Sequence, residues 1–83
     1  MEDNYVYALI LIDFENPNKS TVTTFNTQQL ALDKLQEWYE DDLKNAYFTN
    51  VIMHGNSCYE YTNKFSNKRT MVVYNKSYVF DKL

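Results

Sequence analysis

The chain has 83 residues, a net charge of −3 and 45% hydrophobic side chains. This length fits a single domain, residues 1–83, near the size at which one hydrophobic core is only marginally sufficient, so we expect oligomerisation. The single cysteine, Cys58, excludes an internal disulfide and favours a reducing, cytoplasmic setting, because small secreted domains usually carry several disulfides.

We expect no signal for export or membrane insertion in the N-terminal residues. Residues 1–4 are acidic where a signal peptide would be basic, and Asp13 ends the following apolar run well short of a membrane span. We therefore expect an intracellular protein with no membrane partner.

The first predicted strand, from about Tyr5 to Phe14, is apolar on both faces. Strand side chains alternate between the two faces of a sheet. One face therefore carries Val6, Ala8, Ile10, Ile12 and Phe14, and the other carries Tyr5, Tyr7, Leu9 and Leu11. A loop at residues 15–19 and a Thr-rich strand at residues 20–25 complete a hairpin, with the second strand expected at the edge of the sheet.

An amphipathic helix follows this hairpin. We expect Asn26 to cap it, Gln29 to complete a capping box and Phe25 to pack on Leu30. At about 100° per residue, one arc of the helix is apolar. Its members are Ala31, Leu32, Leu35, Trp38, Tyr39, Leu43 and Ala46. Asp42 also falls in this arc, and the sequence leaves open whether it lies at the rim or makes a polar contact.

Residues 47–82 show turn signals and no helical period, which predicts a meander of short antiparallel strands. Gly55 and Asn56 suit a type II′ turn between residues 51–54 and 57–60. The next reversal is expected at residues 64–68, and Asn75 with Lys76 is expected to join residues 69–74 to residues 77–80. The predicted fold class is α+β, an antiparallel sheet of four to six strands in the order ββαββββ with one amphipathic helix packed on one face.

The last predicted strands are also apolar on both faces, and one helix can shield only one face of a sheet. We expect the other face to bind a second copy of the chain in a homodimer or higher oligomer, a host protein, or both. The predicted partner-binding residues are Tyr5, Tyr7, Leu9, Leu11, Tyr74 and Tyr78. Alternation assigns residues to faces without showing which face the helix chooses, so the helix could also cover this tyrosine-bearing side.

Enzymatic activity is not expected from this sequence. One cysteine and one histidine allow only a pair of Cys58 with His54. The predicted hairpin sets Met53 opposite Cys58 and His54 opposite Ser57, which places the thiol and the imidazole on different sides of the ribbon. The sequence contains neither a glycine-rich phosphate loop nor a set of zinc ligands, so we expect no cofactor and no metal.

Single-stranded nucleic-acid binding is the alternative function, since tyrosines can stack on bases and basic side chains can meet phosphates. Residues 43–83 hold six basic and two acidic side chains, whereas residues 1–42 hold two basic and nine acidic ones. The candidate nucleic-acid-binding residues are Lys64, Lys68, Arg69 and Lys76. The overall acidity and the single arginine weigh against this function.

The leading hypothesis is a small non-enzymatic protein-interaction module that acts sterically through an aromatic sheet face. Frequent Asn, Lys, Tyr, Phe and Ile residues have AT-rich codons, which suggests an AT-rich genome such as that of a virus or mobile element. The hypothesis therefore includes inhibition of a host or defence protein by a viral protein.

Overall fold

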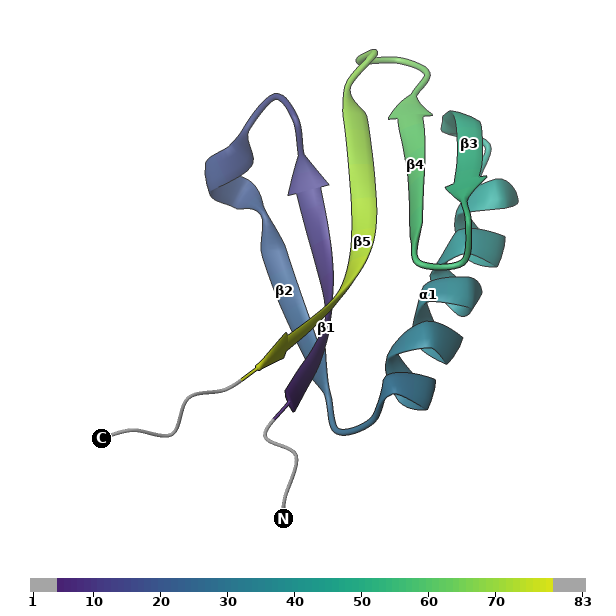
Figure 1. The fold of residues 1–83 in the computed structure, drawn as a ribbon. Coiled ribbons are helices and arrows are strands. Elements are labelled where there is room, and N and C mark those ends of the chain that lie inside the picture. Colours follow the sequence, from purple (N-terminus) through teal and green to yellow (C-terminus); the bar gives the residue numbers. More distant parts are fainter. Residues whose placement is uncertain (1–4, 79–83) are drawn as a thin grey trace.

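Five strands and one α-helix make up most of residues 5–78, the part of the chain that the computed structural model describes (Figure 1). Their bounds are β1 Tyr5–Asp13, β2 Thr21–Phe25, α1 Gln28–Leu43, β3 Phe48–His54, β4 Cys58–Asn63 and β5 Arg69–Tyr78, with a short 3-10 helix at Pro17–Lys19. The strands form one antiparallel sheet in the order β2-β1-β5-β4-β3, and α1 packs on one face of it. The predicted α+β class is confirmed.

The hairpin of β1 and β2 forms as expected from the sequence. Leu11 lies opposite Thr21 and Tyr7 lies opposite Phe25, and β2 is an edge strand. On its other side β1 pairs with β5 along its full length. This double pairing places the most apolar segment of the chain inside the sheet, where its backbone hydrogen bonds are satisfied on both sides.

The predicted hairpin at Asn75 and Lys76 is wrong, because β5 runs through both residues as a single strand. Asn75 lies opposite Ala8 and Lys76 lies opposite Tyr7. A reversal at this point would leave the first half of β1 without its partner on that side, so long-range pairing overrides the local turn preference of asparagine. Residues 79 and 80, part of the last predicted strand, lie outside the described residues.

The turn between β3 and β4 has one residue more than predicted. His54 lies opposite Cys58 and Met53 lies opposite Tyr59, so three residues connect the strands, with Gly55 at φ +65°. A β-bulge between Thr49 and Ile52, where Asn50 adopts a φ of +53°, shifts the register again. The bulge lies on an edge strand, where bulges commonly interrupt further pairing.

The helix begins one residue later than predicted. Thr27, rather than Asn26, is the N-cap, and its Oγ1 accepts a hydrogen bond of 3.2 Å from the Leu30 amide. Ala31 and Leu35 are buried against the sheet, but Leu43, which also belongs to the predicted apolar arc, is about half exposed, as is Leu30 in the first turn.

The core lies between α1 and the sheet. Leu9, Leu35, Tyr59 and Val72 form its fully buried centre, with relative exposures of at most 1%. Leu9 on β1 packs with Leu35 on α1, so the helix covers the face of the sheet that carries Leu9 and Leu11. The structure therefore decides the question that alternation left open.

Candidate functional site

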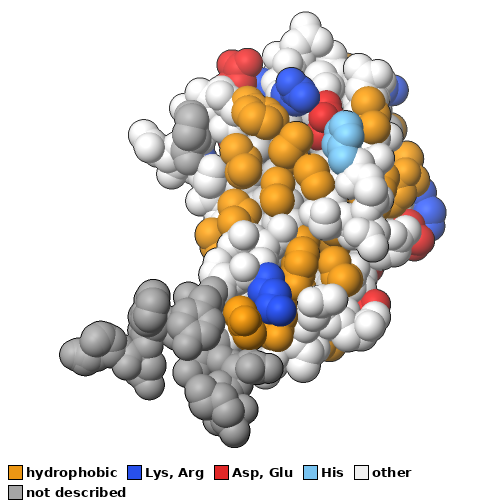
Figure 2. All heavy atoms as spheres, viewed as in Figure 1, with side chains coloured by type: hydrophobic (Ala, Val, Ile, Leu, Met, Phe, Trp, Pro, Cys, Tyr) orange, Lys and Arg blue, Asp and Glu red, His pale blue; other side chains and the backbone are white. Residues whose placement is uncertain are grey.

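The sheet has an apolar face on the side away from α1. Cross-strand neighbours share a face, so Ile10 lies beside Val22 and Val73, and Ile12 lies beside Met71. Figure 2 shows hydrophobic side chains gathered across this side of the molecule. We call it the helix-free face and define its apolar part as Val6, Ile10, Ile12, Val22, Ile52, Met71 and Val73.

Side chains on the helix-free face differ in their exposure to solvent. Ile52 is 46% exposed and Val22 is 60% exposed, while Ile10, Ile12 and Met71 are partly buried by their neighbours within the sheet. Aliphatic groups at adjacent positions on β2, β1 and β5 thus form one surface, and Glu60 on β4 separates it from Ile52 on β3. Contiguous apolar surface of this kind is typical of association sites.

Three of the predicted partner-binding residues, Leu9, Leu11 and Tyr74, lie on the helix-covered face instead. Leu9 belongs to the core, and Leu11 and Tyr74 pack against it. Tyr74 also donates a hydrogen bond of 3.2 Å from its hydroxyl to Gln28 Oε1 at the start of the helix. The expected surface and the observed one therefore occupy opposite sides of the sheet, and the observed surface is aliphatic rather than rich in tyrosine.

Tyr5, Tyr7 and Tyr78 lie toward one end of the sheet. Tyr7 is partly buried, and the Lys76 Nζ atom lies 4.2 Å from the centre of the Tyr5 ring. Tyr78 ends β5 opposite Tyr5, and its side chain lies outside the described part of the structure.

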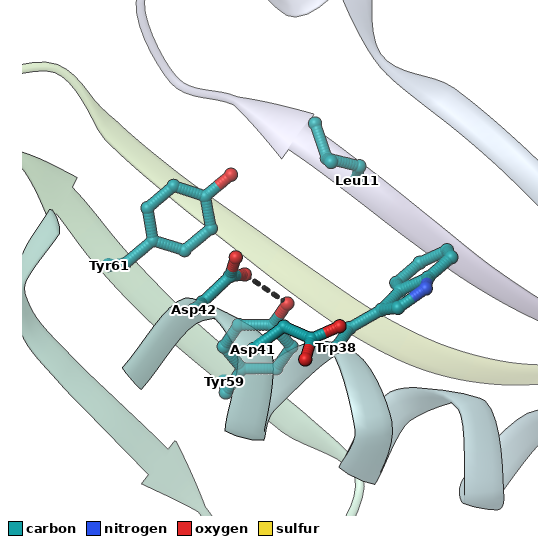
Figure 3. Close-up of a pocket in the computed structure, with 6 residues that line it drawn as sticks. All are labelled: Leu11, Trp38, Asp41, Asp42, Tyr59 and Tyr61. Atoms are coloured by element: carbon teal, nitrogen blue, oxygen red, sulfur yellow. Dashed lines mark hydrogen bonds between the residues drawn. The ribbon is translucent and has the colours of Figure 1, made fainter. Parts of the chain in front are cut away.

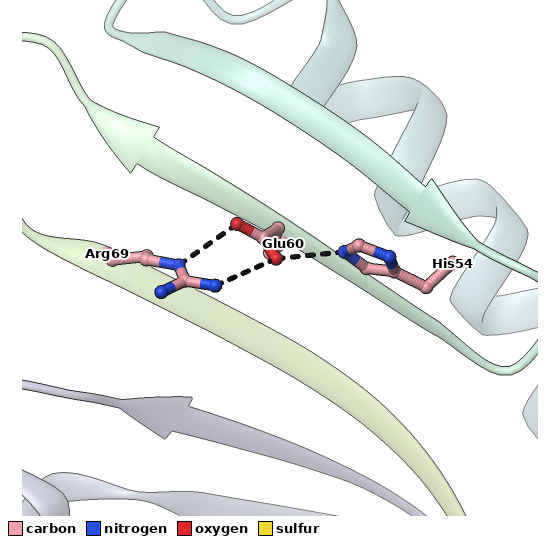
Figure 4. A network of polar contacts seen from close by, with 3 residues as sticks. All are labelled: His54, Glu60 and Arg69. Atoms are coloured by element: carbon pink, nitrogen blue, oxygen red, sulfur yellow. Dashed lines mark hydrogen bonds and ion pairs between the residues drawn. The ribbon is translucent and has the colours of Figure 1, made fainter.

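A carboxylate with two basic neighbours lies within the helix-free face (Figure 4). Glu60 is only 8% exposed, and its two oxygens accept hydrogen bonds of 3.0 and 3.1 Å from the Arg69 guanidinium. His54 Nε2 lies 2.8 Å from Glu60 Oε1. The guanidinium, and to a smaller extent the imidazole, holds the pKa of Glu60 below its usual range.

Loss of the Glu60 charge is expected to lower stability at acid pH. Because the pKa of Glu60 is lower in the folded chain than the usual 4.5, its stabilising contribution is present above that pH and disappears as pH falls through the folded value. In urea titrations over a pH series, the wild type should lose stability more steeply below pH 4.5 than Glu60→Gln does. If the stability of the two proteins falls equally with pH, the contacts of Glu60 with Arg69 and His54 do not stabilise the fold.

The candidate nucleic-acid-binding residues do not form one patch. Lys64 and Lys68 belong to the turn between β4 and β5, whereas Lys76 lies near the far end of β5. At about 3.3 Å per residue, Lys68 and Lys76 are separated by about 26 Å along the strand. Arg69 is paired with Glu60, and its guanidinium carbon lies 5.1 Å from the centre of the Phe14 ring.

The thiol and imidazole lie on the same side of the ribbon, so the predicted separation of His54 and Cys58 is wrong. The longer turn changes the register by one residue and sets them opposite each other. Burial, with a smaller contribution from the Glu60 charge, raises the pKa of Cys58. Since the thiolate is the nucleophile, this shift makes Cys58 less reactive than an ordinary cysteine.

A second candidate site is a pocket of about 240 Å³ between the C-terminal half of α1 and the sheet (Figure 3). The side chains that line it are Leu11, Trp38, Asp41, Asp42, Tyr59 and Tyr61. The Tyr59 hydroxyl donates a hydrogen bond of 2.6 Å to Asp42 Oδ2, which explains why an acidic residue interrupts the apolar arc. Asp42 was the one signal in the sequence that could have indicated this site.

Comparisons of the chain with protein-family models, curated proteins and solved structures give no match. Within residues 5–78, no group of three or more histidine, cysteine, aspartate or glutamate side chains is arranged to hold a metal ion. None of the described helices has the length and apolar character needed to cross a bilayer.

Proposed function

We propose that the chain is a small non-enzymatic protein-interaction module that self-associates through the helix-free face. The observation that carries this proposal is the apolar surface around Ile10, Ile12, Met71 and Val73, which no other element of residues 5–78 covers. The one helix is already committed to the opposite face, where Leu35 packs on Leu9. A chain of this size gains stability when a partner supplies the missing layer.

A second sheet is the partner that best fits a surface of this shape. Two sheets can pack face to face about 10 Å apart, with side chains from the inner faces interdigitating. Two copies related by a twofold axis would form such a sandwich, with their helices outside. Pairing with Arg69 and His54 lowers the cost of burying the Glu60 carboxylate, because no isolated negative charge is left in the interface.

In this proposal the activity is steric and needs no catalytic group. A virus- or mobile-element-encoded inhibitor of a host or defence protein would engage its target through the same face. We also propose a cytoplasmic location, which is supported by the free thiol of Cys58 in a chain without a second cysteine.

Sedimentation equilibrium tests the proposal without any other protein. We expect a species heavier than the 9.9 kDa monomer at micromolar concentrations, and we expect the association to persist at high salt because apolar burial drives it. A monomer at high micromolar concentration would contradict self-association. Association that disappears at moderate salt would indicate a charged interface instead.

A further inference from the structure

The pocket between α1 and the sheet combines aromatic rings with carboxylates around one opening. Trp38, Asp41 and Asp42 come from the helix, while Tyr59 and Tyr61 come from β4 and Leu11 comes from β1. Figure 3 shows these side chains around the same space, with Asp42 extending toward the two tyrosines. The volume of about 240 Å³ lies below the range of about 300–1,000 Å³ found for most ligand pockets, so the pocket suits a small chemical group.

Neighbouring rings hold the aromatic walls of the pocket in place. The Tyr59 and Tyr61 rings lie 6.2 Å apart at an interplanar angle of 29°. Phe48 stacks on Tyr61 with 4.1 Å between the ring centroids, and Tyr39 and Tyr59 pack in a T-shaped arrangement with 5.6 Å between theirs. Because these rings are already packed in the free protein, their side chains lose little conformational entropy when a ligand binds.

The charge in the pocket is negative and partly desolvated. Burial raises the pKa of Asp42, and the neighbouring Asp41 raises it further, although the hydrogen bond from Tyr59 acts in the opposite direction. Burial and the charge of Asp42 also raise the pKa of Tyr61. Each shift shows that an anion is disfavoured here, so a bound cation would relieve the electrostatic cost.

We propose that this pocket binds an alkylammonium group. The partly exposed rings of Trp38 and Tyr61 supply the aromatic surface that attracts such a cation, and Asp41 and Asp42 supply the opposite charge. The Tyr59 ring is buried beneath them, and its hydroxyl holds the Asp42 carboxylate in place. The methyl or methylene groups of the ligand would pack against Leu11 and the rings. This pocket lies on the helix side of the sheet, so the inference does not depend on self-association through the helix-free face.

Trp38 is the only tryptophan in the chain, and its fluorescence reports directly on the pocket. The probes are Nα-acetyl-Nε-trimethyl-lysine methylamide, choline, and the neutral analogue of the lysine probe with carbon in place of the quaternary nitrogen. We expect a saturable fluorescence change with the cationic probes and a much weaker response to the neutral analogue. Tighter binding of the lysine probe than of choline would indicate that the natural ligand is a modified lysine side chain of a protein. Tighter binding of choline would indicate a small molecule.

Asp41→Asn removes one pocket charge at an exposed position and should weaken binding of the lysine probe by roughly two- to fivefold. Glu37→Gln is the matched control, because it removes one charge from the same helix where Glu37 is exposed and paired with Lys34. It should leave the affinity nearly unchanged. Equal losses in the two variants, equal binding of the neutral analogue, or no saturable change in Trp38 fluorescence would each overturn the proposal.

Discussion

Replacing Ile10 by lysine should weaken self-association by at least about tenfold, the loss expected for a residue near the centre of an interface. Ile10 lies between Val22 and Val73 in the helix-free face, and a twofold interface would contain the new charge twice. The monomer should remain folded, because Ile10 is only partly buried and the lysine stem can cover its apolar neighbours. Sedimentation equilibrium measures the association, and circular dichroism checks the fold.

Thr23→Lys is the matched control for Ile10→Lys. Thr23 is exposed on β2 and lies opposite Leu9, so the new charge would stand on the helix side of the same sheet. We expect association close to that of the wild type. Equal weakening by the two variants would show that net charge, rather than the helix-free face, controls association.

Leu9→Ala should lower the free energy of unfolding by about 2–5 kcal/mol, since it removes a fully buried side chain and leaves a cavity. Leu9 is 1% exposed and packs with Leu35, Tyr59 and Val72. Domains of this kind are stable by only about 5–15 kcal/mol, so the variant loses a large part of its stability. A charged residue at Leu9 should therefore unfold the chain rather than act mainly on association.

Ile10→Ala is the matched comparison for Leu9→Ala, because the two residues are adjacent in β1 but lie on opposite faces. At protein concentrations low enough to keep the chain monomeric, urea denaturation should show a smaller loss for Ile10→Ala than for Leu9→Ala. A loss at Ile10 as large as that at Leu9 would mean that the helix-free face is already covered within the monomer.

Local signals in the sequence predicted the elements whose formation depends on near neighbours. The period of Ala31, Leu35, Trp38 and Tyr39 predicted the helix, and the apolar run from Tyr5 predicted the first strand. The N-cap differed by one residue because both Asn and Thr can cap a helix, and the structure shows that Thr27 accepts the capping hydrogen bond from the Leu30 amide.

Long-range pairing decided the features that the sequence could not predict. Asn75 and Lys76 resemble a turn, but pairing with β1 keeps them extended. Strand alternation separated Leu9 from Ile10 without showing which of them meets the helix. Recognition of the pocket required knowing that Asp42 on α1 meets Tyr59 on β4, a contact between residues 17 positions apart in the chain.

Intermolecular nuclear Overhauser effects in a mixed sample of ¹³C-labelled and unlabelled chain test the central claim most directly. If the helix-free face is the interface, methyl groups of Ile10, Ile12 and Val73 should show effects from the unlabelled copy, whereas those of Leu9 and Leu35 in the core should show none. Intermolecular effects confined to the helix side, or their absence at concentrations where the chain sediments as an oligomer, would contradict the account.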